Sequence, residues 1–195
     1  MNEFVIKKLT KYFMTESMDS YEAEILEYGI ATTVLNLPKS LLLIAIAMIL
    51  GLTKPLMLIF LFYGMIRNFS RGIHAKTALG CFLVGTANYI GMAYLAKVIT
   101  VPQKLYHAVY AYCFYVYYKY APSGTEVNPV YPDQVMLLKK WSLIIILSYY
   151  IIGLKQQRGM IRNVGMLSVL SQSISILPVT YMISKQRGGI IHEEE

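Results

Sequence analysis

Acidic residues are nearly absent from the long central part of this 195-residue chain. Between Tyr28 and His192 only Glu126 and Asp133 carry a carboxylate, and charged residues make up 15% of the whole sequence. A soluble domain of this size normally carries about 25% charged residues. The shortage argues against an ordinary soluble domain. Apolar runs separated by small basic clusters predict several membrane spans joined by short loops.

Several catalytic and transport motifs are also missing from the sequence. It has no His-Glu-x-x-His zinc pattern, no paired intramembrane aspartates and no Gly-x-Ser-x-Gly elbow, which leaves metallo-, aspartyl and serine-hydrolase sites without support. No glycine-rich phosphate loop precedes a basic residue. No acid lies within an apolar run, where a proton- or ion-coupled transporter usually places one. No cofactor and no metal are expected.

Cysteine is scarce, and its two positions differ in their surroundings. A disulfide between Cys81 and Cys113 would need both at one depth and in an oxidising compartment. Cys113 lies within an aromatic run, where a small buried thiol is expected. Both cysteines are predicted to be reduced. The net charge of +7 forms no continuous basic stripe, and therefore no nucleic-acid partner is expected.

What the sequence does contain is a series of apolar segments after an amphipathic start. Residues 1–28 predict an amphipathic interfacial segment, in which Asp19 followed by Glu22 resembles a helix-capping pair. Residues 29–195 predict a polytopic transmembrane domain, and the expected fold is an all-α integral membrane protein. About six spans or partial spans are expected, roughly at 30–52, 55–65, 78–99, 105–120, 141–154 and 161–184. The second and fifth are shorter than the roughly 20 residues of a perpendicular span.

Basic residues predict the orientation of these spans. With six spans and a cytoplasmic N-terminus, eleven Lys and Arg residues lie inside and six lie outside. This split places both termini and the loop around His74 in the cytoplasm. Lys155, Arg158 and Arg162 form a basic cluster on the outside, at the turn between the last two predicted spans. This cluster opposes the rule that basic residues gather on the cytoplasmic side. The predicted location is a bacterial cell membrane, with a multi-pass chain.

One polar segment, residues 67–81, concentrates the groups that can do chemistry. A Cys paired with a His is the minimal set for nucleophilic acyl transfer, because the imidazole takes the thiol proton and later returns one to the leaving amine. In a straight helix the Cα atoms of His74 and Cys81 would stand about 10 Å apart along the axis, too far for such a pair. We therefore predict that the chain bends after Gly72, so that His74 meets Cys81 near the start of the third span.

These residues resemble a known family, the accessory gene regulator protein B peptidases of Gram-positive quorum-sensing systems. The resemblance is carried by Arg67, Gly72, His74 and Cys81, with the family's seven-residue step from His to Cys. A second match is the loop that contains Ala121-Pro122, followed by the basic pair Lys139 and Lys140.

The resemblance implies cleavage of a small membrane-associated propeptide near its C-terminal side. Cys81 would be the nucleophile and His74 the base and acid, and an internal Cys or Ser of the propeptide would attack the acyl-enzyme to close a thiolactone or lactone ring. The residues predicted to bind substrate or shape the site are Arg67, Arg71, Gly72, Lys76, Lys139 and Lys140.

Some questions stay open on the sequence alone. No third residue is assigned to orient His74, and Asn68, Asn88 and Glu126 are candidates on chemistry. The expected partners are an amphipathic propeptide and membrane lipids, and a homodimer is compatible with so small a membrane protein. The alternatives are a transporter or peptide-export protein, or a structural membrane partner, in which His74 and Cys81 would be incidental.

Overall fold

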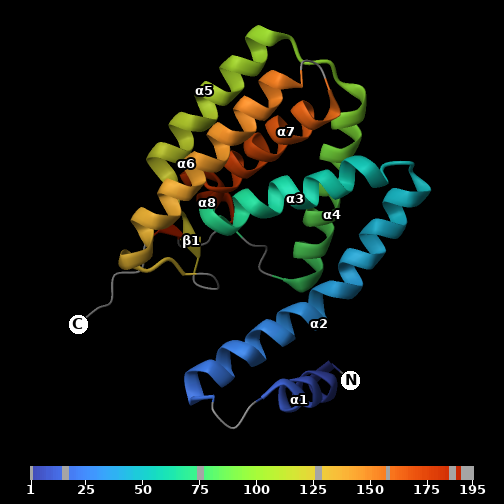
Figure 1. Ribbon diagram of the computed structural model, residues 1–195, viewed down its shortest axis with the longest axis vertical. Coiled ribbons are helices and arrows are strands. Elements are labelled where there is room, and N and C mark those ends of the chain that lie inside the picture. The colour runs from blue at the N-terminus through green and yellow to red at the C-terminus, as the bar shows by residue number, and fades with distance from the viewer. Residues whose placement is uncertain are drawn as a thin grey trace. The chain divides into compact units, whose positions relative to one another are not determined.

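Helices account for almost all of the described chain, which confirms the predicted all-α class (Figure 1). The computed structural model describes residues 2–14, 18–73, 77–125, 129–156, 159–184 and 188–189. Two units are distinguished, Met1–Leu50 and Gly51–Glu195. All of the site residues predicted from the sequence belong to the second unit.

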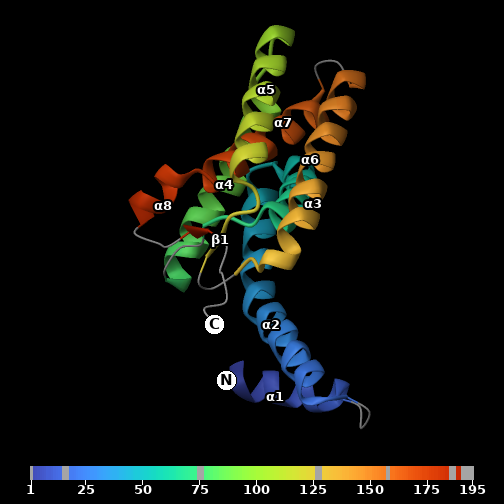
Figure 2. The same ribbon diagram turned by 90° about the vertical axis from the view of Figure 1, so that its left-hand side faces the viewer.

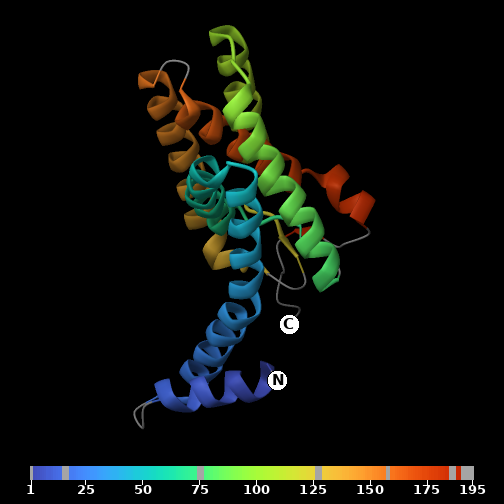
Figure 3. The same ribbon diagram turned by 90° about the vertical axis from the view of Figure 1, so that its right-hand side faces the viewer.

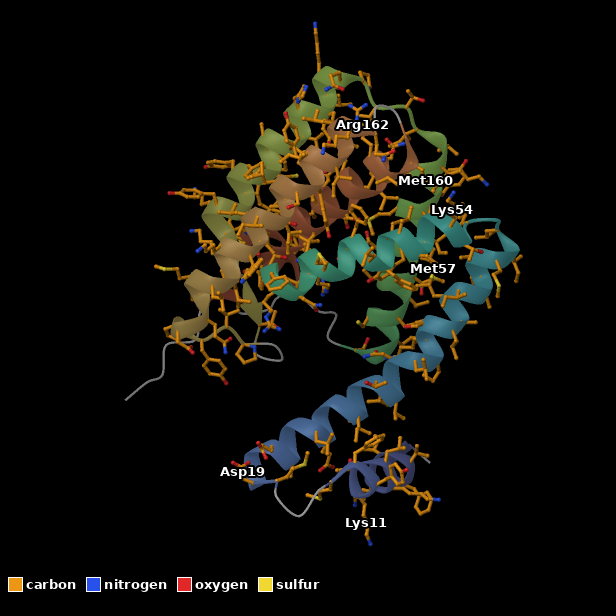
Figure 4. The ribbon with its side chains drawn as sticks, viewed as in Figure 1. Lys11, Asp19, Lys54, Met57, Met160 and Arg162 are labelled. Atoms are coloured by element: carbon orange, nitrogen blue, oxygen red, sulfur yellow. The ribbon has the colours of Figure 1, made fainter. Side chains whose placement is uncertain are left out.

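The first unit holds two helices, α1 (Asn2–Phe13) and α2 (Ser20–Ile49). Asp19, labelled in Figure 4, accepts a hydrogen bond from the Glu22 N–H at 2.7 Å, and its own N–H donates to the Glu22 carboxylate at 3.3 Å. This reciprocal pair is a capping box, which satisfies two N–H groups that a helix start would otherwise leave unbonded. The predicted cap at Asp19 is confirmed. The boundary predicted after residue 28 stays a prediction.

The second unit contains six helices and two very short strands among its described residues. They are α3 (Thr53–Ser70), α4 (Ala78–Val98), α5 (Gln103–Tyr120), β1 (Gly124–Thr125), α6 (Pro132–Lys155), α7 (Met160–Ser175), α8 (Pro178–Ser184) and β2 (Gly188–Gly189). The strands β1 and β2 pair antiparallel, with Gly124 opposite Gly189. Every predicted apolar segment of this unit is therefore helical.

The helix α7 lies at the centre of the second unit, in contact with α3, α4, α5 and α6. Every residue from Arg162 to Val169 is buried. Eight consecutive buried residues cover every face of the helix, so this part of α7 is enclosed by its neighbouring helices. A Cβ added at Gly165 would make ordinary van der Waals contacts, 3.4 Å from the Tyr110 hydroxyl and 3.5 Å from the Phe62 ring.

Three of the described helices, α2, α4 and α6, have the length and composition to cross a membrane. The helices α7 and α8 add a fourth candidate if both belong to one span, although they are bent by 60° at their junction (Figures 2 and 3). The predicted count of six spans is not confirmed. The helix α3 carries Lys54 and Arg67 near its ends, and α5 is rich in tyrosine. Both helices pack against α7, and on α5 Tyr106, Tyr110 and Tyr117 are buried. Lys54 on α3 is exposed, whereas Arg67 is half-buried.

The helix α6 differs from its predicted segment. Residues 141–154 are shorter than a span, whereas the helix covers 24 residues from Pro132 to Lys155. The basic pair Lys139 and Lys140 interrupts the apolar run, but lysine is a good helix former and proline fits the first helical position. The basic pair thus lies on the N-terminal part of α6.

The end of the second unit that holds the start of α7 is organised around Arg162, which is labelled in Figure 4. Arg162 is only 3% exposed. Its Nη2 donates to Gln103 Oε1 at 3.0 Å, and its guanidinium lies 4.2 Å from the centre of the Tyr106 ring. The neighbouring Asn163 Nδ2 donates to the Ile99 C=O at 2.9 Å, beyond the end of α4. Arg162 is therefore a buried side chain, and its predicted place on the outer side of the membrane stays a prediction.

Candidate functional site

The helix α3 ends abruptly inside the predicted polar segment. It stops at Ser70, because Arg71 has a φ of 58° and Gly72 a φ of 123°, both outside the helical range. The Arg71 N–H still bonds to the Arg67 C=O at 3.0 Å, but the Gly72 N–H donates to the Ser123 C=O at 2.8 Å. The chain therefore leaves the helix and runs beside the loop that precedes β1.

Gly72 is required by both conformation and space. Its φ of 123° is rarely adopted by residues with a side chain. A Cβ at this position would lie 2.5 Å from Ser175 Oγ and 3.3 Å from the Ser175 carbonyl oxygen. The next residue, Ile73, donates its N–H to the same carbonyl at 3.2 Å. The C-terminal end of α7 thus holds the backbone just before His74.

Arg67 is directed into the protein. Its Nη1 lies 3.2 Å from the Tyr63 hydroxyl and 3.2 Å from Gln172 Oε1, and its Nη2 donates to the Ile73 C=O at 2.8 Å. The side chain is half-buried. These bonds support the predicted role of Arg67 in shaping the site, since they tie the residue before His74 back to α3.

Gln172 connects the end of α3 to α7. Its side chain is fully buried, with 0% exposure. Its Nε2 donates to Ser70 Oγ at 2.8 Å and, in a short contact, to the Arg71 C=O, while its Oε1 accepts from Arg67. A buried amide keeps such a geometry because an unmade hydrogen bond in the interior costs about 1–3 kcal/mol.

The loop before β1 forms the other side of this segment. Ser123 donates its N–H to the Ser70 C=O at 3.1 Å, and its own C=O accepts from the Gly72 N–H and, at 2.8 Å, from the Tyr181 hydroxyl. Residues of α3, α8 and the Ala-Pro-containing loop therefore meet beside the segment that leads to His74.

Cys81 is exposed on the first turn of α4. Thr77 is the N-cap of this helix, with extended backbone, and its Oγ1 accepts from the Gly80 N–H at 3.0 Å. The Cys81 N–H donates to the Thr77 C=O at 2.9 Å. Because Thr77 is extended, one uninterrupted helix from residue 74 to Cys81 is ruled out, as predicted. The contact between His74 and Cys81 stays a prediction. Cys113 is buried on α5, as predicted.

Several predicted residues lie outside the described part of the chain. They are His74 and Lys76, together with Glu126, a candidate to orient His74. Of the other candidates for that role, Asn68 is exposed and Asn88 accepts a hydrogen bond from Ser171 Oγ at 2.8 Å. The residue that orients His74 stays a prediction.

The predicted basic residues have different surroundings. Arg71 is half-buried, and its backbone forms an isolated β-bridge with Ser123. Lys140 is exposed. The Lys139 ammonium lies 4.8 Å from the centre of the Tyr118 ring. Beside this pair, Trp141 contacts Phe69 of α3 at 6.0 Å between ring centres. The part of α6 around Trp141 is therefore close to the end of α3, where Arg71 lies.

The residues that support this segment from a distance were not predicted from the sequence. Gln172 and Ser175 are more than 100 residues beyond Arg71 and Gly72 in the sequence, and Tyr181 is 58 residues beyond Ser123. A signal was present for one of them, because Gln172 is a polar residue within a largely apolar segment. Such residues usually contact protein rather than lipid.

Comparison with known proteins identifies similar chains along nearly the full length. The model of the family described as Accessory gene regulator B matches residues 6–176. An AgrB-like protein of Clostridium acetobutylicum is 26% identical over 194 residues, which cover 99% of this chain and 91% of that protein.

Two further relatives are similar over shorter lengths. Protein FsrB of Enterococcus faecalis is 28% identical over 72% of this chain and 58% of its own length. The accessory gene regulator protein B of Staphylococcus haemolyticus is 25% identical over 78% of this chain and 81% of its own. No solved structure matches the chain.

Proposed function

Because the chain belongs to the accessory gene regulator B family, we propose that it is a membrane cysteine endopeptidase of quorum sensing. Its substrate is an autoinducer propeptide, which it cleaves on the C-terminal side and releases as a cyclic thiolactone or lactone. Cys81 is the nucleophile and His74 the general base and acid. The site faces the cytoplasm.

The reaction has two acyl-transfer steps. His74 accepts the Cys81 proton as the sulfur attacks the scissile carbonyl, and the imidazolium then protonates the leaving amine as the C–N bond breaks. In the second step an internal thiol or hydroxyl of the peptide gives its proton to His74 and attacks the thioester. Cys81 leaves and regains its proton. No water is consumed, so a site that excludes water favours ring closure over hydrolysis.

The observation that carries the proposal is the placement of Cys81. It is the exposed one of the two cysteines, and it sits on a helix start that follows a break in the chain. The residue before His74 is held through both its N–H and its C=O. A Cys–His pair reacts efficiently when the two side chains are held at a defined distance and the thiol is accessible. The held backbone before His74 and the exposed Cys81 meet these two needs.

Basic residues around the site would bind the substrate by charge. Lys140 is exposed on α6, close to the end of α3, and Lys76 and Arg71 belong to the segment that leads to Cys81. Clustered cations raise the local concentration of a peptide with an acidic tail. Arg67 and Gly72 shape the site from within.

Matched variants test the chemistry. Cys81→Ala and His74→Ala should each abolish processing of a co-expressed, epitope-tagged propeptide, measured as loss of the smaller product on a gel. Cys113→Ala and His107→Ala remove the same side-chain types from α5 and should retain processing. A Cys81 acyl-enzyme should be detected by mass spectrometry when the internal nucleophile of the propeptide is replaced by alanine.

Normal processing by Cys81→Ala would overturn the proposal. In that case a transporter or export function, which does not depend on a thiol, would be the better account.

A further inference from the structure

We propose that Gln172 is a positioning residue for the catalytic pair, and that it acts through Arg67 on the backbone that leads to His74. The inference rests on the proposed function. Gln172 lies on α7, 91 residues beyond Cys81 in the sequence, and it does not belong to the motif that carries the family resemblance.

The hydrogen bonds of Gln172 converge on one short piece of chain. Its Nε2 binds Ser70 Oγ and the Arg71 C=O, and its Oε1 binds Arg67 Nη1. All three partners belong to the last turn of α3 or to the residue after it. Both donor hydrogens and the acceptor of the amide are therefore used on the segment that precedes His74.

Arg67 transmits this constraint to the next residues. A guanidinium has its donors in a rigid plane, so a bond that fixes one nitrogen also orients the other. With Nη1 held by Gln172, Nη2 is directed at the Ile73 C=O at 2.8 Å. Ile73 is the last residue before His74, and its N–H is held by Ser175, three residues after Gln172.

The segment depends on these bonds because local structure does not hold it. The helix has ended, and both Arg71 and Gly72 have positive φ values, which cost energy at Arg71 in particular. The constraint therefore comes from tertiary contacts, with Ser123 on one side of the segment and Gln172 and Ser175 of α7 on the other. Loss of Gln172 would remove this acceptor from Arg67. The backbone from Arg71 to Ile73 could then shift by a fraction of an ångström or more.

The test uses the full chain in detergent, with alkylation of Cys81 by N-ethylmaleimide as the probe. The wild-type rate is measured against pH, and His74→Ala defines the profile of a thiol without its base. Gln172→Ala should give a profile close to that of His74→Ala and should lower propeptide processing roughly 10- to 100-fold, since misplacing a catalytic group by about 1 Å costs about a hundredfold.

The matched control is Gln103→Ala. Gln103 binds Arg162 in the same amide-to-guanidinium manner, but at the opposite end of α7. This variant should keep the wild-type alkylation profile. Gln172→Glu serves as the second variant, because it keeps the acceptor for Arg67 and loses the donor to Ser70 and Arg71. It should retain more of the wild-type profile than Gln172→Ala does.

A double-mutant comparison checks the route through Arg67. If Gln172 acts through that residue, adding Gln172→Ala to Arg67→Gln should change the profile little further. A wild-type profile in Gln172→Ala, alongside a changed one in His74→Ala, would overturn the inference and leave the proposed function intact. If His74→Ala itself leaves the profile unchanged, the Cys–His pair and the proposed function both fail.

Discussion

Gly72 shows at the scale of one residue how a motif position follows from geometry. Its φ of 123° and the 2.5 Å between an added Cβ and Ser175 Oγ are two separate requirements for glycine. The sequence predicts that Arg67 binds substrate or shapes the site. Its guanidinium is hydrogen-bonded to Tyr63, Gln172 and the Ile73 carbonyl, which fits the second of these roles. Both residues act on the position of the segment that precedes His74.

Gly72→Ala should therefore remove propeptide processing while Cys81 remains present. The added methyl group must displace Ser175, and overpacking of this kind costs about 1–3 kcal/mol. Processing is measured on a gel, and folding by the temperature at which the detergent-purified protein aggregates.

The control for that change is Gly64→Ala on α3, the helix that ends just before Gly72. No atom lies within 4 Å of an added Cβ there, and alanine is the better helix former. Gly64→Ala should keep both processing and thermal stability. Normal processing by Gly72→Ala would contradict the role assigned to this glycine.

At the scale of elements, helix ends decide where the functional groups lie. The break at Thr77 starts α4 so that Cys81 falls on its first turn, and the end of α7 supplies Gln172 and Ser175 to the end of α3. In the first unit, the capping box at Asp19 determines where α2 begins. These ends are set by few hydrogen bonds and can be tested one at a time.

Asp19→Ala should loosen the first turn of α2, because it removes the acceptor for the Glu22 N–H. The loss of an N-cap side chain costs about 1 kcal/mol. Hydrogen exchange followed by mass spectrometry should show faster exchange in a peptide that covers residues 20–24. Asp19→Asn, which keeps an acceptor oxygen, should exchange nearly as the wild type does. Equal exchange in Asp19→Ala and the wild type would show that the cap contributes nothing.

At the scale of the whole molecule, the second unit has two different ends. One end joins α3, α7 and the loop before β1 through Ser70, Gln172 and Ser123. The other joins the beginning of α7 to α5 and to the residues after α4 through Arg162 and Asn163. The predicted orientation of these two ends across the membrane stays a prediction.

Labelling of single cysteines tests which end faces the cytoplasm. In a Cys81→Ala, Cys113→Ala background, exposed Thr100→Cys should react with an impermeant maleimide in intact cells. Exposed Tyr131→Cys, before α6, should react only after permeabilisation, because more basic residues flank that end. The reverse pattern would place the proposed site on the outer face.

The sequence by itself determined the membrane class, the approximate positions of α3, α4 and α5, the cap at Asp19 and the need for a break before Cys81. Each of these follows from local composition or from residue spacing along one helix. The length of α6 was missed because Lys139 and Lys140 interrupt an apolar run without ending the helix.

Only the tertiary structure decided which side chains support the segment around Gly72. Gln172 meets Arg67 across 105 positions of the chain, and no local pattern records such a contact. It also decided that Arg162 is buried, since a charge is recognised as internal only when its neighbours from α5 are in place. Contacts between residues distant in sequence depend on helix packing, and packing is a property of the folded chain.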